Sequence, residues 1–149
     1  MLSVLLIEPH EDICKLYAPV LQSLDFRVHT TTNTDDACEL VSHADVLVTE
    51  LQVPGRFDGI AMIRWIRSHP AKHSMPIVVL TASSDRLHQR AARTAGCDLF
   101  LTKPCRALDL AIGIRHAAMW RSGLTVMLKA KLDLRQDHSR DDAKTRRAG

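Results

Sequence analysis

The 149-residue sequence lacks several patterns that mark common classes of protein. It has no apolar run long enough to span a membrane, and no basic leader precedes its first apolar residues, so we expect neither a membrane helix nor a signal peptide. Its four cysteines form no C-x-x-C pair, which favours reduced thiols in a cytoplasmic protein over disulfides or a zinc site. It contains no G-x-G-x-x-G or P-loop pattern, which argues against a nucleotide-binding enzyme.

An excess of positive charge is also missing from most of the chain. Residues 1–122 contain 13 Lys plus Arg and 13 Asp plus Glu, whereas residues 123–149 contain seven and four. A neutral body gives no electrostatic reason to expect nucleic acid on the folded domain. We therefore expect no nucleic-acid partner there, and the weakly basic tail to serve solvation.

The sequence does contain a series of short apolar runs, each of which stops at a polar residue. Such runs, separated by segments of helical periodicity, are typical of a parallel sheet. The pattern predicts an α/β fold with a doubly wound, five-stranded parallel sheet in a (βα)5 order. Right-handed crossovers would place two helices on one face and three on the other. The predicted strands are 2–8, 26–30, 45–50, 76–81 and 99–102.

The periodic pattern divides the chain into a domain at residues 1–122 and a C-terminal extension at residues 123–149. Residues 124–134 alternate apolar and polar side chains as a strand does, but they also include strong helix formers, so their structure stays open. From Gln136 onward no apolar residue recurs regularly, and we expect disorder there.

Complementary polar groups stand at the ends of the predicted strands. Glu8 follows the first strand, Glu50 ends the third, Thr81 ends the fourth, and Lys103 follows the fifth. The carboxyl ends of parallel strands form the ligand crevice of such a sheet, so these side chains should converge. A carboxylate can attack a phosphoryl group while Mg²⁺, a cation and a hydroxyl hold the phosphoryl oxygens. The set predicts phosphoryl and metal chemistry, with Glu8 and Glu50 as candidate metal ligands.

Six segments occur in an order and at spacings that match a known family: Leu5–Glu8, Asp45–Glu50, Val53–Gly55, Asp58–Gly59, Val79–Ala82 and Gly96–Pro104. On these segments, the stretch from Leu2 to about Ser122 resembles the receiver domain of bacterial two-component response regulators. The resemblance implies that Thr81 binds a phosphoryl group, Lys103 is the site cation, Phe100 is an aromatic switch residue and the bond before Pro104 is cis. It also implies a signalling module and not an enzyme, with a histidine kinase, a phosphotransfer protein or an output protein as partner.

Two departures from the family pattern fall on the chemistry itself. Glu50 stands where the family has its phosphate-accepting aspartate, and its extra methylene displaces the carboxylate in a reaction that depends on placement. Pro9 stands where the family has the second acid that holds Mg²⁺, so the magnesium site should be weak. We therefore expect an atypical receiver with weakened or lost phosphorylation. Glu50 would pair with Lys103 and hold one state, either like the phosphorylated form or like the inactive one.

Two other functions remain open at this point. Glu50 could act as a conventional Mg²⁺-dependent phosphoacceptor that carries the phosphoryl group slowly. A small flavodoxin-like enzyme would use the same scaffold, although the sequence has no phosphate-cradling loop for it.

The last predicted helix, residues 106–122, is apolar on more than one side, which is typical of a helix with a second partner. We expect Leu108, Ala111, Ile112 and Met119 to face the core, with Leu110, Ile114, Ala117 and Trp120 elsewhere. In receivers the fourth helix, fifth strand and fifth helix form the usual output and dimer face, so a homodimer through them is expected. Cover by residues 124–134 of the same chain is the alternative.

Overall fold

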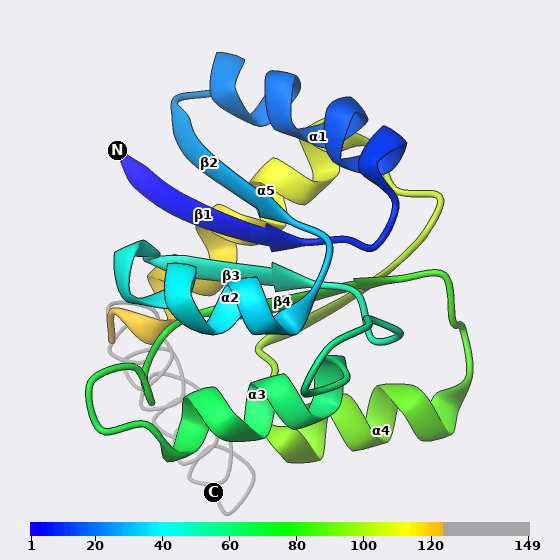
Figure 1. Ribbon diagram of the computed structural model, residues 1–149. Coiled ribbons are helices and arrows are strands. Elements are labelled where there is room, and N and C mark those ends of the chain that lie inside the picture. The colour runs from blue at the N-terminus through cyan, green and yellow to red at the C-terminus, as the bar shows by residue number, and fades with distance from the viewer. Residues whose placement is uncertain (124–149) are drawn as a thin grey trace, which may run out of the picture. The chain divides into compact units, whose positions relative to one another are not determined.

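The computed structural model describes residues 1–123, in which strands and helices alternate along the chain (Figure 1). The chain divides into two units, Met1–Ala118 and Met119–Gly149. The expectations for residues 124–149, including the strand-like alternation, lie outside the described residues. The elements are β1 (Leu2–Ile7), α1 (Glu11–Ser23), β2 (Phe26–Thr31), α2 (Thr34–Leu40), a 3-10 turn (Val41–His43), β3 (Val46–Thr49), α3 (Gly59–Ser68), β4 (Ile77–Thr81), α4 (Arg86–Ala95), β5 (Leu99–Thr102) and α5 (Ala107–Arg121).

The five strands form one parallel sheet in the order β2-β1-β3-β4-β5. The first strand lies inside the sheet and the chain winds outward from it in both directions. All of β3 and all of β4 are buried, which explains why their sequences are continuous apolar runs. The predicted doubly wound α/β fold is confirmed, and each strand boundary falls within one residue of its prediction.

Two separate apolar layers cover the two faces of the sheet. Figure 1 shows α2, α3 and α4 on one side and α1 and α5 on the other, as the crossover rule predicts. The first layer is built around Met62, Ile63 and Ile66 of α3. The second is built around Leu21 of α1 and Leu110 of α5. All four cysteines are free; Cys14 is buried and the other three are partly exposed.

The predicted orientation of the last helix is wrong. Leu108 and Ile112 are more than half exposed and Met119 is nearly so, whereas Leu110, Ile114 and Ala117 are buried. Only Ala111 of the expected set faces the core, and Trp120, expected outside it, is exposed. Gly113 belongs to the buried face: a Cβ there would lie 2.7 Å from Leu99 Cδ2, so the missing side chain lets α5 approach β5 closely.

Candidate functional site

Backbone hydrogen bonds at the carboxyl edge of the sheet fix the residues that follow the strands. The amide of Glu8 donates to the carbonyl of Thr31, and the amide of Glu50 donates to the carbonyl of Ile7, both at 3.0 Å. The amide of Lys103 donates to the carbonyl of Thr81 at 2.8 Å. Parallel pairing therefore delivers the polar residues that end these strands to one place.

The side chains of Glu8, Glu50 and Lys103 form a buried ionic group, which we call the acid–lysine cluster. The ammonium of Lys103 donates to Glu8 Oε2 at 2.5 Å and to Glu50 Oε2 at 2.9 Å. Both glutamates are buried, and the Lys103 side chain is 16% exposed. One ammonium thus holds two carboxylates whose mutual repulsion would otherwise be unrelieved. Glu8, Glu50 and Lys103 therefore lie together, as predicted, and Glu50 pairs with Lys103.

Both oxygens of the Glu50 carboxylate accept hydrogen bonds. The Leu51 amide donates to Oε1 at 2.7 Å, while the Ala82 amide donates to Oε2 at 3.2 Å, alongside Lys103. The buried hydroxyl of Thr81, which accepts the Ser83 amide at 3.2 Å, contributes to lowering the pKa of this carboxylate. Three donors therefore hold the carboxylate, and they leave few of its lone pairs for a new bond.

These contacts keep both partners charged near neutral pH. Burial would raise the pKa of Glu50, but the hydrogen bonds from Thr81, Lys103 and Leu51, with the charge of Lys103, bring its pKa below the ordinary value. Burial would lower the pKa of Lys103, yet its hydrogen bonds to Glu8 and Glu50 and their charges raise that pKa above the ordinary value. Each charge stabilises the other.

The loop after β3 is tied down close to Glu50. Gly59, the first residue of α3, donates its amide to the Leu51 carbonyl at 2.8 Å. A Cβ at Gly59 would lie 2.3 Å from the Glu50 carbonyl oxygen, so the helix can begin here only with glycine. Across the loop, the Thr34 hydroxyl donates to the Phe57 carbonyl at 2.8 Å. The backbone that carries Glu50 is thus fixed from two sides.

A cleft of roughly 410 Å³ opens beside the cluster. Its lining includes Pro9, as the family pattern implies, and also His10, Gln52 and Ser83, which sequence reasoning did not place among the site residues. Each lies within two residues of a predicted strand end, and this position is the signal that could have found them. His10 is mostly exposed and its amide donates to Glu8 Oε1 at 3.1 Å.

Phe100 lies apart from the acid–lysine cluster. It is partly buried and packs against the apolar layer of α2, α3 and α4. Its position is that of a core aromatic residue at the edge of the layer, and a switch role stays a prediction. The Lys103–Pro104 peptide bond is cis, as the resemblance implies.

The donors that could hold a divalent cation are few. Glu8 and Glu50 face the cleft, but an oxygen of each is bound by Lys103, and Pro9 brings no side-chain oxygen. Within residues 1–123, no group of three His, Cys, Asp or Glu side chains comes together that could hold a metal ion. Mg²⁺ prefers oxygen ligands, and here the Lys103 ammonium already occupies one oxygen of each carboxylate and offsets part of their charge.

The fold and these strand-end residues agree with the comparison to known families. Residues 4–115 match the response regulator receiver domain family, so the chain belongs to that family. It is a receiver domain of two-component signalling. Receiver domains are signalling domains and not enzymes in the ordinary sense, so the match favours a signalling role over the flavodoxin-like alternative. In the part of the chain that the structure describes, no helix is long and apolar enough to cross a membrane.

Among curated proteins, the chain is similar to the transcriptional regulatory protein GltR of Pseudomonas aeruginosa. The two are 32% identical over 117 residues, which cover 76% of this chain and 47% of that regulator. The chain therefore spans about half the length of this relative. The other half of that regulator lies outside the matched region.

Two solved structures illustrate the shared fold. A response regulator receiver domain protein from Clostridium thermocellum superposes with a TM-score of 0.74, at 23% identity over 83% of this chain and 99% of that one. The receiver domain of a sensor histidine kinase from Pseudomonas aeruginosa, which holds a magnesium ion in its active-site cleft, gives 0.71 at 23% identity over 78% and 97%. At this identity the likeness concerns the fold alone.

Proposed function

We propose that this chain is an atypical receiver domain that acts through protein contact, with phosphoryl acceptance at Glu50 weakened or absent. The observation that carries the proposal is the acid–lysine cluster, in which the Lys103 ammonium binds both carboxylates of the site. We also propose that residues 1–122 are the receiver domain, that residues 123–149 are an extension of it, and that the chain is cytoplasmic.

The contacts that hold the Glu50 carboxylate restrict its nucleophilic attack on a phosphoryl group. Oε2 accepts from both Ala82 and Lys103 and Oε1 accepts from Leu51, so one lone pair of Oε1 is left to attack phosphorus. The same contacts lower the pKa of Glu50, and a less basic carboxylate is a weaker nucleophile. The longer side chain adds a displacement from in-line geometry.

The residues at the site do not fit a bound magnesium ion well, which supports the same proposal. Among the described residues that line the cleft, Glu8 and Glu50 are the only acids. A divalent cation would have to displace the Lys103 ammonium from both of them. At Pro9 no side-chain oxygen is available. Without the metal, charge on a transferring phosphoryl group is poorly compensated.

A conventional Mg²⁺-dependent phosphoacceptor is the second candidate. The shared cleft favours it, because Thr81 and Lys103 lie beside Glu50 where they could hold phosphoryl oxygens. In that case Glu50 would carry the phosphoryl group slowly and also release it.

The surface for protein contact in this proposal comprises α4, β5 and α5. Leu87 of α4 and Leu108 and Ile112 of α5 are each more than half exposed. Apolar side chains of this size favour association when a partner covers them. Either a signalling protein or a second copy of this chain could cover this surface.

The experiment that tests the proposal is incubation with acetyl phosphate and Mg²⁺, followed by intact-mass spectrometry and treatment with hydroxylamine. We expect no hydroxylamine-sensitive adduct on the natural chain. The double variant Glu50→Asp, Pro9→Asp, which restores the family's acids, should gain one, and Glu50→Gln serves as the matched blank. An adduct on Glu50 in the natural chain would establish the second candidate instead.

A further inference from the structure

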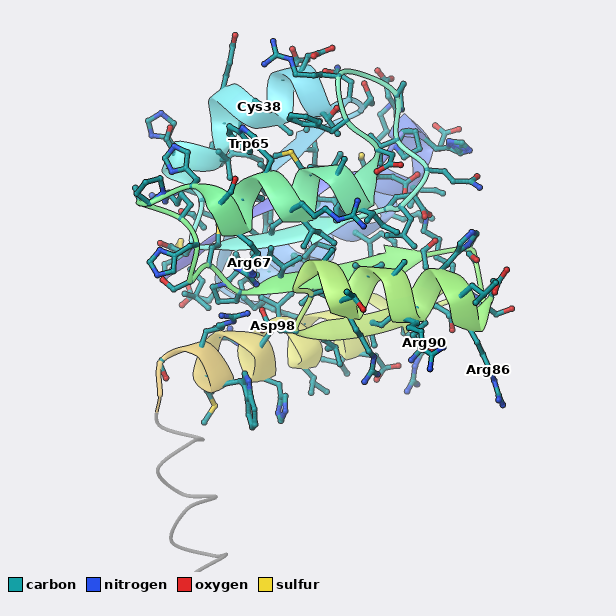
Figure 2. The ribbon with its side chains drawn as sticks, turned by 90° about the horizontal axis from the view of Figure 1, so that it is seen from below. Cys38, Trp65, Arg67, Arg86, Arg90 and Asp98 are labelled. Carbon is teal, nitrogen blue, oxygen red and sulfur yellow. The ribbon has the colours of Figure 1, made fainter. Side chains whose placement is uncertain are left out.

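The outward face of α4 carries a row of three arginines, Arg86, Arg90 and Arg93, which we call the arginine strip. Spacings of four and three residues put them on one side of the helix, opposite the buried Ala92 and Ala95. All three are exposed and line a shallow groove. Figure 2 shows Arg86 and Arg90 projecting from α4 away from the rest of the domain. The strip is a continuous patch of positive charge.

No acid within residues 1–123 pairs with the arginine strip. Three other arginines do have carboxylate partners: Arg56 pairs with Asp35, Arg67 with Asp98 and Arg106 with Asp109. The segment Arg86–Ala95 contains no Asp or Glu, and the nearest acid, Asp85, uses its side chain to cap the helix through the Leu87 amide at 2.8 Å. The strip therefore presents three guanidinium groups to whatever approaches it.

This arrangement disfavours the helix that carries it. Like charges four and three residues apart repel each other on a helix surface. Arg86 is also the first helical residue, where the positive end of the helix dipole disfavours a cation, and only Arg93, in the last turn, is favourably placed. Mixed charges would solvate the same face without these penalties. The strip is therefore better explained by a contact outside the domain than by the stability of α4.

The positive charge of the arginine strip argues against a second copy of this chain as the partner that binds there. A symmetric dimer places the same patch of both copies in one interface, so a contact centred on α4 would set two arginine strips against each other. Like charges opposed in this way are costly. The exposed apolar residues of α5 do not remove this repulsion.

The rest of the domain argues against a polyanion such as nucleic acid or a lipid surface. Residues 1–122 are neutral overall, so the strip is balanced by acids elsewhere. Glu11, Asp36 and Glu39, for example, line a cavity at α1 and α2. An extended polyanion gains affinity from positive charge summed over a broad footprint. A compact acidic protein surface needs only the strip, and guanidinium groups bind carboxylates through paired hydrogen bonds.

We propose that the arginine strip of α4 docks an acidic segment of a partner protein, with carboxylates of that segment paired to Arg86, Arg90 and Arg93. This inference rests on the proposed role in protein contact and names the chemistry of the partner.

The test measures binding of a fluorescently labelled oligoglutamate peptide to the full chain by anisotropy at low ionic strength. The triple variant Arg86→Gln, Arg90→Gln, Arg93→Gln should bind about tenfold more weakly, and added salt should weaken binding to the natural chain. The matched control Lys15→Gln, Arg27→Gln, Arg64→Gln removes three exposed cations from α1, β2 and α3, and should bind nearly as well as the natural chain. Circular dichroism of both variants should show unchanged helix content.

Four outcomes would overturn the proposal: no binding of the peptide, an equal loss in the control variant, tighter binding of a single-stranded oligonucleotide or of phosphatidylserine vesicles, or a natural dimer that the strip variant disrupts. The phosphodonor assay on Glu50 is read separately. The strip can therefore fail while the account of Glu50 stands, and the reverse also holds.

Discussion

Two buried ionic groups lie at opposite edges of the sheet and use similar chemistry. At the carboxyl edge, the Lys103 ammonium binds Glu8 and Glu50 beside an open cleft. At the amino edge, the Arg67 guanidinium binds Asp98 at 3.1 Å, and these two labelled side chains lie together in Figure 2. Both cations are about equally exposed, at 16% and 15% of their side chains.

The difference lies in what else each cation contacts. Arg67 donates to the carbonyls of Gly96 at 2.8 and 3.0 Å and of Met75 at 2.6 Å, while Asp98 accepts the Ile77 amide at 2.8 Å. Its contacts join the ends of α3 and α4 to the starts of β4 and β5. Lys103 contacts side-chain carboxylates next to a cleft, and such contacts can be exchanged for others. A buried ion pair thus indicates a site only where a ligand or partner can reach it.

The largest expected effect is that of removing the Arg67 guanidinium. Arg67→Ala leaves Asp98 buried without its guanidinium, so we expect a loss of about 3 kcal/mol or more in the free energy of unfolding, measured by urea denaturation. Arg64→Ala, an exposed position on the same helix, is the control and should change it by less than about 0.5 kcal/mol. A loss below about 1 kcal/mol for Arg67→Ala would contradict a joining role.

Removing the lysine should have a smaller effect that depends on pH. Lys103→Met leaves Glu8 and Glu50 as neighbouring buried charges, and we expect a loss of about 2 kcal/mol near neutral pH. The loss should shrink on acidification, because protonation of one carboxylate relieves the repulsion. Denaturation curves of both proteins across a pH series measure it, with Lys15→Met as the exposed control. A loss that does not vary with pH would show that the charges are not coupled.

The smallest expected effect concerns Glu50 alone. Its pKa is lowered in the folded state, so the stability that its ionised form contributes is present above the unfolded value of 4.5 and is lost as pH falls through the folded value. Glu50→Gln should therefore cost about 1 kcal/mol near neutral pH, and the difference from the natural chain should narrow below pH 4.5. A difference that widens in acid would mean that the sign of the pKa shift is wrong.

Much of the fold could be predicted from sequence because strands buried on both faces are marked by uninterrupted apolar runs. Polar residues at the ends of those runs then had to meet at one edge, which is how Glu50, Thr81 and Lys103 could be grouped. The family resemblance added the role of each position. None of this required knowledge of packing.

The rest depended on packing that a single sequence does not reveal. The helix Ala107–Arg121 is apolar on several sides, so its periodicity could not select the buried face. Gly113 was the overlooked signal, since a residue without a side chain suits the face nearest the sheet. Arg67 and Asp98 are 31 residues apart and meet only through the tertiary fold. Their pairing could not be read from local spacing.

The central claim, that Glu50 held by Lys103 is a poor phosphoryl acceptor, is tested most directly by the mass of the chain after incubation with acetyl phosphate and Mg²⁺. The account predicts an unchanged mass for the natural chain and a gain of one phosphoryl group for the Glu50→Asp, Pro9→Asp variant. A hydroxylamine-sensitive gain on the natural chain, absent from Glu50→Gln, would contradict it.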